Sequence, residues 1–305
     1  AASDVYKRQA VIPIEGSRIA FTTDSYVVKP PFFPGGDIGA LAVYGTVNDL
    51  SMVGALPLYL SCGFILEESL DMAVLERVVS SIQSAARRAG VQIVTGDTKV
   101  VESGGADGLF INTAGIGLVP EGVEVSLANA RAGDRVLCSG TIGDHGVAVL
   151  CRREGIELVS SLESDLAPLN NLVARLLEAT PRVHCLHDPT RGGLASALNE
   201  MAAQSQVGIS VEETRLPVKA AVRGACELLG LDPLYIANEG KIVAVLAPED
   251  ADRALDAMRS HPDGRDAAII GDVVASPRGT VMLRTLAGGT RIVHLLTDEQ
   301  LPRIC

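Results

Sequence analysis

The stretch VIPIEGSRIAFTTDSYVV, residues 11–28, decides the fold class. Its two strand-like runs, Val11 to Ile14 and Arg18 to Val28, are separated only by Glu15-Gly16-Ser17, which is typical of a β-hairpin. Further along the chain, strand-like and helix-like segments alternate. Because an antiparallel hairpin is combined with this alternation, the sequence favours an α+β (mixed α/β) protein of two domains over one doubly wound parallel sheet.

The periodicity of apolar residues predicts the remaining elements. In the first half, we expect helices over 38–53, with Asp37 as the N-cap, and over 72–89, ending at Gly90; strands are expected over 58–66, 91–94 and 109–119. In the second half, we expect helices over 146–153, 171–178, 193–203, 218–229 and 248–260, and strands over 135–139, 183–186, 207–211, 241–246, 268–274, 281–285 and 290–295.

Glycine- and proline-containing turns at 120–122 and 131–134 indicate a boundary between two domains. We therefore expect a foreign or disordered start at 1–10, an N-terminal domain at 11–122, a C-terminal domain at 131–290 and a mobile tail at 296–305. A chain of 305 residues is long enough for two hydrophobic cores.

Composition excludes several classes of function. A formal net charge of −11, without runs of Lys or Arg, disfavours nucleic acid as a partner. No apolar stretch approaches the roughly 18 residues that a membrane helix needs, and residues 1–9 lack the apolar core of a signal peptide. We expect a cytosolic protein. Five of the six cysteines lie in apolar settings without a CxxC pair, which indicates reduced core residues.

The sixth cysteine, Cys305, is the last residue. About ten residues follow the last predicted strand, and an extended tail of that length could sweep some 30 Å. Such a tail could carry a thiol into a cleft of its own subunit or out to a partner. The alternative is a disordered end that happens to finish in cysteine.

Four aspartates follow or interrupt apolar elements: Asp24, Asp37, Asp49 and Asp97. Asp49 shares a predicted helix face with Ile38 and Met52, so its carboxylate is expected among apolar side chains. A buried carboxylate needs a counter-charge, and several together suit a hard cation. For Asp37, a simple N-cap explains the residue equally well.

Three loops add further candidates. Gly96-Asp97-Thr98-Lys99 is expected in a turn just past strand 91–94, where ligands collect in α/β layers. The Asp188 to Gly193 loop opens a helix, so it could present backbone N–H groups to a phosphate, or serve only as a turn. Glu239 lies on a strand-edge loop, where a solvated side chain is the ordinary expectation. His145 is expected only at a helix start.

Together these strings resemble the HypE family of hydrogenase maturation factors, which are ATP-dependent carbamoyl dehydratases. The matching segments are residues 21–28, 33–39, 45–50, 95–101, 188–194, 237–241 and 302–305. The internal motifs are also similar to the wider superfamily of aminoimidazole ribonucleotide synthetases, selenophosphate synthetases and thiamine monophosphate kinases. The terminal Pro302-Arg303-Ile304-Cys305 is specific to the HypE family.

The resemblance implies a two-domain, aminoimidazole ribonucleotide synthetase-like fold and a role for each candidate. Cys305 would carry the substrate, while Glu239 and Lys99 would assist catalysis. A magnesium ion would be bound by Asp24, Asp49 and Asp97. ATP or the tail would be bound by Asp37, Asn48, Gly96, Thr98, Asp188, Thr190, Arg191, Gly192 and Gly193.

The resemblance also implies partners and a reaction. A HypF-type carbamoyltransferase would load Cys305, ATP would drive dehydration of the S-carbamoyl group to S-cyanate, and cyanide would pass to iron on a HypC–HypD-type complex. It further implies a homodimer formed through N-terminal-domain strands and a tail that swings inward and outward. The family's glycine-rich start is missing before Val11, so a truncated N-terminal domain is expected.

Two other classes of function remain open at this stage. A small-molecule kinase or synthetase of the same fold would not need Cys305. A non-catalytic thiol carrier would need Cys305 but not ATP.

Overall fold

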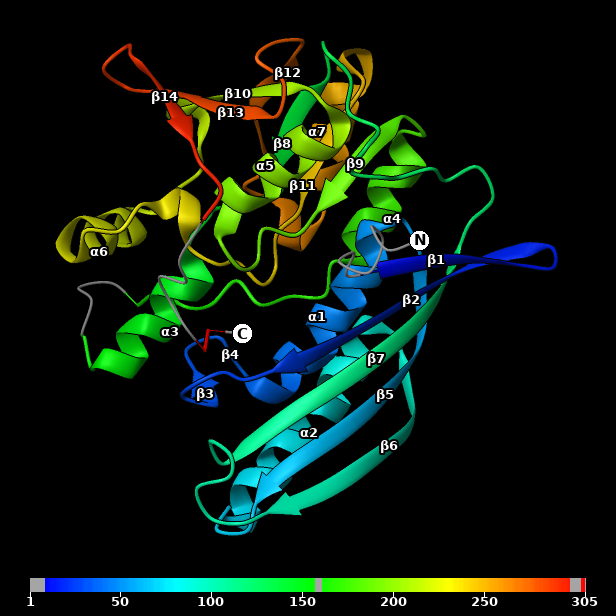
Figure 1. The fold of residues 1–305 in the computed structure, drawn as a ribbon, viewed down its shortest axis with the longest axis vertical. Helices are drawn as coiled ribbons and strands as arrows, with labels where there is room; N and C mark the ends of the chain where they lie inside the picture. The colour runs from blue at the N-terminus through cyan, green and yellow to red at the C-terminus, as the bar shows by residue number, and fades with distance from the viewer. Residues whose placement is uncertain (1–8, 157–160, 297–302, 305) are drawn as a thin grey trace.

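The N-terminal half is a five-stranded sheet with helices on one face (Figure 1). The structure is a computed structural model, and it describes residues 9–156, 161–296, 303 and 304. The strand order is β1-β2-β7-β5-β6, formed by β1 (Gln9–Ile14), β2 (Ser17–Tyr26), β5 (Leu56–Glu67), β6 (Gln92–Val101) and β7 (Leu109–Val119). The predicted hairpin is confirmed, since Ile14 of β1 pairs with Ser17 of β2.

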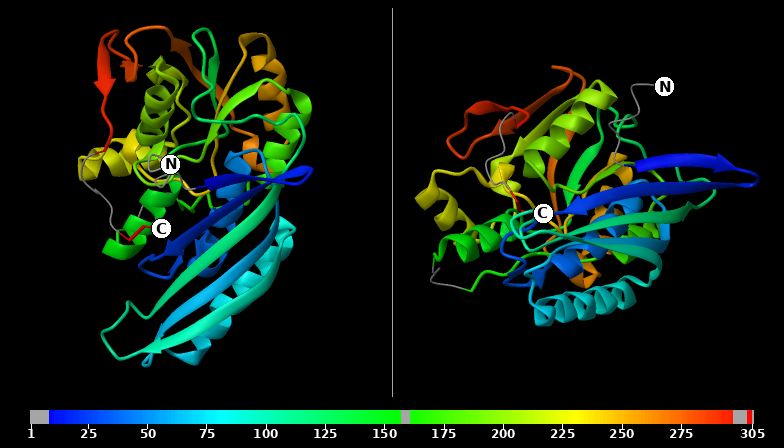
Figure 2. Two further views of the ribbon diagram at one scale, coloured as in Figure 1. Left: turned by 45° about the vertical axis from the view of Figure 1, so that its right-hand side comes forward. Right: turned by 60° about the horizontal axis from the view of Figure 1, so that its bottom comes forward.

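Two helices cover the inner face of this sheet. Helix α2 (Met72–Ala89) lies along it, as the bottom-forward view in Figure 2 shows. Helix α1 (Ile38–Met52) begins after the short strands β3 (Phe32–Phe33) and β4 (Gly36–Asp37). The predicted cap is confirmed, because the Asp37 carboxylate accepts hydrogen bonds from the N–H groups of Gly39 and Ala40.

Helix α1 is buried on almost its whole circumference, because it lies between the sheet and the C-terminal half. Its partners include β2 and β7 on one side and α4 on the other. Polar residues of α1 such as Asn48 and Asp49 therefore lie in the interior, and each needs a hydrogen-bond partner there.

The C-terminal half is a seven-stranded mixed sheet with helices around it. The strand order is β14-β13-β10-β12-β8-β11-β9. The strands are β8 (Arg135–Cys138), β9 (Val183–His187), β10 (Gly208–Glu212), β11 (Val243–Leu246), β12 (Ala268–Val274), β13 (Thr280–Arg284) and β14 (Thr290–Val293). The helices are α3 (Asp144–Glu154), α4 (Asn170–Ala179), α5 (Gly193–Ser205), α6 (Ala220–Leu229) and α7 (Ala251–Arg259).

One predicted element is wrong in a way that matters for the site. Gly96 to Lys99 was expected in a turn after a short strand, but these residues lie inside β6. The parallel ladder with β5 continues from Cys62 opposite Gly96 to Glu67 opposite Val101. This ladder satisfies the backbone of a Gly-Asp sequence that resembles a turn, so the chain stays extended.

The described residues bear on two further expectations, the reduced core cysteines and the absence of a membrane-spanning helix. Cys62, Cys138, Cys151, Cys185 and Cys226 are all buried and free, which confirms reduced core cysteines. No helix in the described ranges is both long and apolar enough to cross a membrane.

Gly96 provides a test of the β5–β6 ladder. A Cβ at Gly96 would lie 2.2 Å from the carbonyl oxygen of Cys62, so Gly96→Ala must push the strands apart. We expect a loss of about 1–3 kcal/mol in the free energy of unfolding, measured by urea denaturation. Gly63→Ala is the matched control in the neighbouring strand, because its Cβ would meet nothing closer than 3.8 Å. Equal midpoints for the two variants would contradict the packing argument.

Candidate functional site

Three loops of the C-terminal half are joined by the side chain of Asn238. Its Oδ1 accepts the N–H of Gly143 at 2.7 Å, and its Nδ2 donates to the carbonyl of Pro189 at 2.9 Å. Asn238 is buried, so these bonds are sheltered from water. The loop before α3, the Asp188 to Gly193 loop and the loop carrying Glu239 are thereby held as one unit.

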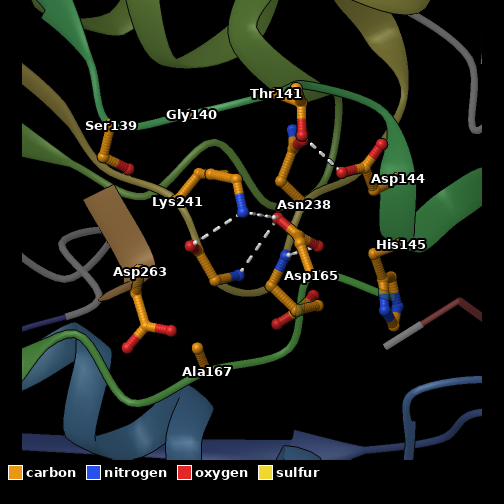
Figure 3. Close-up of polar contacts among 12 residues, drawn as sticks. Ser139, Gly140, Thr141, Asp144, His145, Asp165, Ala167, Asn238, Lys241 and Asp263 are labelled. Atoms are coloured by element: carbon orange, nitrogen blue, oxygen red, sulfur yellow. Dashed lines mark hydrogen bonds and ion pairs between the residues drawn. The ribbon is translucent and has the colours of Figure 1, made fainter. Parts of the chain in front are cut away.

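Asp165 fixes the backbone of the Glu239 loop (Figure 3). One of its oxygens accepts the N–H of Glu239 at 3.1 Å, while the other accepts the N–H of Gly240 at 3.4 Å and lies 3.2 Å from Nζ of Lys241. Burial raises the pKa of Asp165, but the charge of Lys241 and these hydrogen bonds outweigh burial and hold it below its usual value. The pair is therefore charged.

Neither Asp165 nor Lys241 was singled out from the sequence. Asp165 lies in an irregular segment without periodicity, and its partners are about 75 residues away in the chain. Lys241 was part of a matching string but received no role. A buried acid whose only signals are long-range contacts cannot be recognised from local pattern.

Asn48 connects this loop to the N-terminal half. From helix α1, its Nδ2 donates to the carbonyl oxygens of Ala167 and Glu239 at 3.1 and 3.3 Å, and its Oδ1 accepts the N–H of Leu169 at 2.8 Å. The amide predicted to bind a cofactor thus bonds to protein backbone. Glu239 itself is only 4% exposed, so it is not the solvated side chain that its loop position suggested.

The charges of three carboxylates act on the buried side chain of Tyr26. Burial is the main reason that the pKa of Tyr26 is raised well above its usual value, and the charges of Asp24, Asp49 and Glu239 raise it further. The two oxygens of Asp49 accept hydrogen bonds from Gln9 and Thr22, both at 3.0 Å. Two of the three predicted magnesium ligands, Asp24 and Asp49, and the predicted catalytic residue Glu239 therefore all act electrostatically on the same tyrosine.

The third predicted ligand, Asp97, lies elsewhere within the protomer. Its register partner in β5 is Gly63, on the outer face of the sheet, whereas Asp24 alternates with Thr22 and Tyr26 on the inner, helix-covered face. Asp97 pairs with Lys99 at 2.9 Å, and the hydrogen bond from Lys99 is the main cause of its lowered pKa. Both side chains are about 70% exposed, so their attraction is screened by water.

The donor set agrees with magnesium only if a phosphate completes it. Among the residues that the structure describes, no three His, Cys, Asp or Glu side chains lie close enough together to hold a metal ion. Magnesium bound with nucleotides usually takes one or two carboxylates, with phosphate oxygens and water filling the other positions. Asp24 and Asp49 suit that arrangement.

The other predicted binding residues fall into two groups. Gly96 and Thr98 follow the inner face of β6, where Gly96 is packed against the backbone of β5. The Asp188 to Gly193 loop is tightly built, since Gly192 and Gly193 have φ values of +75° and +60° and lead into α5. The N-terminus of α5 therefore follows this loop directly, as the sequence predicted.

Beside this loop, a cleft of about 570 Å³ separates the two halves. Gln9, Met52, His187 and Asp188 are among its lining residues. Burial lowers the pKa of His187, but the carboxylates of Asp188 and Glu200 outweigh it and raise the pKa to about 9. A volume of this order suits a small-molecule ligand.

Near the end of the chain, residues 303 and 304 lie beside α3, close to β3 and β4 (Figure 1). Cys305 and most of the predicted tail lie outside the described residues, but Arg303 and Ile304 are described. The carbonyl of Arg303 accepts from the backbone N–H of Lys29 at 3.2 Å and from Arg153 at 2.8 Å. Ile304 is 3% exposed within the N-terminal core, and its carbonyl accepts from Nε2 of His145 at 2.8 Å.

Comparison with known proteins identifies the relatives of this chain. The model for the N-terminal domain of AIR synthase related proteins matches residues 6–119, and the model for their C-terminal domain matches residues 131–284. Carbamoyl dehydratase HypE of Azotobacter vinelandii is 56% identical over 297 residues, which cover 97% of this chain and 87% of that protein.

The chain belongs to the HypE family. Two crystal structures agree. Hydrogenase maturation protein HypE in complex with ATP superposes with a TM-score of 0.92 at 53% identity, covering 96% of this chain and 89% of the other. The HypE molecule of a HypE–HypF complex gives 0.91 at 48% identity, covering 97% and 98%. The resemblance and the mixed α+β fold expected from the sequence are confirmed.

His187 provides a test of the electrostatics beside the cleft. Its pKa is raised from 6.5 to about 9 in the folded protein. A raised pKa contributes stability that is fully present below about pH 6.5 and is lost as the pH rises through 9. Relative to His187→Gln, the parent should lose on the order of 3 kcal/mol of unfolding free energy across this window. Urea denaturation at several pH values measures it.

The control is His294→Gln, because the side chain of His294 is exposed. Its pH profile should follow that of the parent. Parallel profiles for the parent and His187→Gln would mean that the two carboxylates do not stabilise a charged His187.

Proposed function

We propose that this chain is an ATP-dependent carbamoyl dehydratase that converts an S-carbamoyl group on Cys305 into an S-cyanate for [NiFe] hydrogenase assembly. The observation that carries the proposal is the docking of Ile304 between the two halves, one residue before Cys305 in the sequence. The tail ends in the region where Asp165 and Asn48 hold the Glu239 loop.

The reaction needs an activated oxygen and a base. The amide oxygen of S–C(=O)–NH2 is a poor leaving group, and transfer of the γ-phosphoryl group of ATP to that oxygen makes phosphate the leaving group instead. As phosphate departs with the C–O bond electrons, the nitrogen loses both protons and S–C≡N remains. Atoms and charge balance with ADP, phosphate and the released protons as the other products.

Glu239 is the proposed first proton acceptor. Its backbone is held on one side by Asp165 and on the other by Asn48, which keeps a base in a fixed position. Burial of the side chain excludes competing water. Lys99 is the proposed charge stabiliser, but it lies on the outer face of the sheet in β6.

The position of Lys99 favours a homodimer in which the outer faces of two sheets meet. This face exposes apolar side chains on three adjacent strands: Phe21, Leu56, Leu58, Ile116 and Leu118. Exposed apolar patches of this kind mark interaction surfaces. In such a dimer, Lys99 and Asp97 of one protomer would complete a site of the other.

ATP is the proposed co-substrate, and Mg²⁺ is the metal ion proposed to bind with it. Asp24 and Asp49 would hold the ion together with phosphate oxygens, and the ion would neutralise charge on the phosphates. The Asp188 to Gly193 loop, including Thr190 and Arg191, would bind phosphate through the N-terminus of α5. Asp37 caps α1 in the structure, so any role in nucleotide binding would be additional to that function.

The proposed partners follow the same reaction. The HypE molecule with which this chain superposes was crystallised with HypF. We propose a HypF-type carbamoyltransferase as the supplier of the carbamoyl group and a HypC–HypD-type iron complex as the acceptor of cyanide. Either step requires the tail to leave the docked position seen here.

The mass of the terminal peptide tests the proposal. After carbamoylation by a HypF-type enzyme and addition of ATP, the parent peptide should lose one water, about 18 Da, while Glu239→Gln should keep the carbamoyl mass. General-base assistance is typically worth about 10²–10⁴ in rate, so the variant should be slowed by that factor. Glu163→Gln, an exposed carboxylate in the same region, is the matched control.

Two outcomes would redirect the proposal. Dehydration of Glu239→Gln at the parent rate would place the base elsewhere. Turnover of ATP on a small molecule by a Cys305→Ala variant would favour a kinase or synthetase, whereas the present proposal expects that variant to fold normally and form no cyanate.

Metal dependence gives a second test. Calorimetric titration should show ATP binding in the presence of Mg²⁺ and none in EDTA, because the phosphates cannot approach Asp24 and Asp49 without a cation between them. Asp49→Asn should weaken binding by at least about tenfold, equivalent to about 1.4 kcal/mol. Asp71→Asn, which retains a good N-cap on α2, is the control. Equal affinity of parent and Asp49→Asn would remove Asp49 from the site.

A further inference from the structure

The docked end of the chain is bound through its main chain. The carbonyl oxygens of Arg303 and Ile304 accept hydrogen bonds from Arg153 and His145, at 2.8 Å each. Asp107 adds an ion pair with the Arg303 side chain at 2.6 Å. These contacts recognise the two residues that precede Cys305 and do not depend on what the sulfur carries.

His145 is held in one tautomer. Its ring is fully buried, and Nε2 lies 2.8 Å from the carbonyl oxygen of Ile304. Because a carbonyl can only accept, Nε2 carries the hydrogen. Burial lowers the pKa of His145, so Nδ1 is unprotonated and accepts from the Ser164 hydroxyl at 2.8 Å. Ser164 Oγ in turn accepts the N–H of Leu166 at 3.1 Å.

This chain of hydrogen bonds reaches both halves of the protein. The backbone N–H of Ser164 donates to the carbonyl of Pro34 in the N-terminal half at 2.9 Å. Phe33, the residue before it, packs edge-on against the His145 ring at a centroid distance of 5.3 Å. The next residue along from Ser164 is Asp165, which holds the Glu239 loop. The adjacent residues Ser164 and Asp165 therefore position both the docked end of the chain and the Glu239 loop.

Arg303 has an unusual backbone conformation where the tail enters. Its φ is +56°, in the left-handed region that costs a non-glycine residue of order 1 kcal/mol or more. The surrounding contacts from Lys29 and Arg153 hold it there. The bend turns the chain inward, so that Ile304 is buried and its carbonyl points to His145.

We propose that His145, oriented by Ser164, is a positioning residue that holds the Ile304 carbonyl and so places Cys305 for dehydration. This inference rests on the function proposed above only in its last step. The docking itself can be measured without any chemistry at the sulfur.

Trypsin provides that measurement, since cleavage after Arg303 releases the dipeptide Ile304-Cys305. The protease needs an extended, accessible chain, so release should be slow in the docked parent. His145→Leu removes the donor and should speed release about tenfold, the change expected for a lost buried hydrogen bond of about 1.4 kcal/mol. His145→Gln retains an N–H of similar reach and should release the dipeptide at a rate closer to the parent.

Two further variants keep the test decisive. His184→Leu alters a largely buried histidine that bonds to Asp134, whereas the Ile304 carbonyl is held by His145, so its release rate should equal that of the parent. Ser164→Ala leaves the His145 ring in place but frees its tautomer, and should speed release a few-fold. If His145→Leu does not fold, the release rates of Ser164→Ala and His145→Gln are compared with that of the parent instead. Parent-like release from Ser164→Ala and His145→Leu, or equal release from His145→Gln and His145→Leu, would overturn the proposal.

Dehydration of carbamoylated Cys305 then separates the inference from the proposed function. His145→Leu should lower the rate about tenfold with an unchanged KM for ATP, and His145→Gln should restore most of it. Faster dipeptide release without any dehydration in the parent would refute the proposed function and leave the docking role standing. Faster release with an unaltered dehydration rate would show that docking does not position the thiol.

Discussion

Asp165 and Lys241 form an ion pair that is almost removed from water, with side chains 2% and 11% exposed. Removing two charges from water costs several kcal/mol per ion, and the cost is repaid only when hydrogen bonds satisfy the remaining lone pairs. Here the Asp165 carboxylate also accepts the N–H groups of Glu239 and Gly240. The Asp165 carboxylate can be fully hydrogen-bonded only when the Glu239 loop adopts one conformation. The ion pair therefore also fixes that loop.

The interface between the halves is organised by backbone hydrogen bonds to polar side chains. Asn48 of α1 bonds to three backbone groups of the C-terminal half, and Asn238 bonds to two of its loops. Loss of either amide would leave buried donors and acceptors without partners, at about 1–3 kcal/mol each. The docked Ile304 uses the same principle, since a buried carbonyl is satisfied by a buried imidazole.

Much of the fold could be predicted from local patterns. The hairpin at β1 and β2, the Asp37 cap of α1 and the Gly90 end of α2 all have short-range signals in the sequence. The continuation of β6 through Gly96 does not, because it depends on pairing with β5. For the same reason, the sequence predicts His145 only at a helix start and gives Asp165 no local signal. Their partners, Ile304 and the Glu239 loop, are 159 and about 75 residues away.

The family motifs identified the candidate residues, but they did not show on which face of the sheet each residue lies. Asp24 and Asp97 belong to similar short strings, and only strand register shows that one follows the inner face and the other the outer. The sequence therefore predicts which residues are candidate ligands. Which of them lie together depends on the strand register and on the proposed second protomer.

In the proposed function, Asp24 and Asp49 would link nucleotide binding to the Glu239 loop. The charges of Asp24, Asp49 and Glu239 all act on the ring of Tyr26, so the three carboxylates also repel one another through a poorly solvated region. A magnesium ion held by Asp24 and Asp49 would offset that repulsion at the moment when ATP binds. Because the Glu239 loop is fixed by Asp165 and Asn48, its backbone would not move when the repulsion between the carboxylates is reduced. In the proposed function, the effect of the ion would thus be electrostatic, and it would act on the same carboxylate that is proposed to accept the substrate's protons.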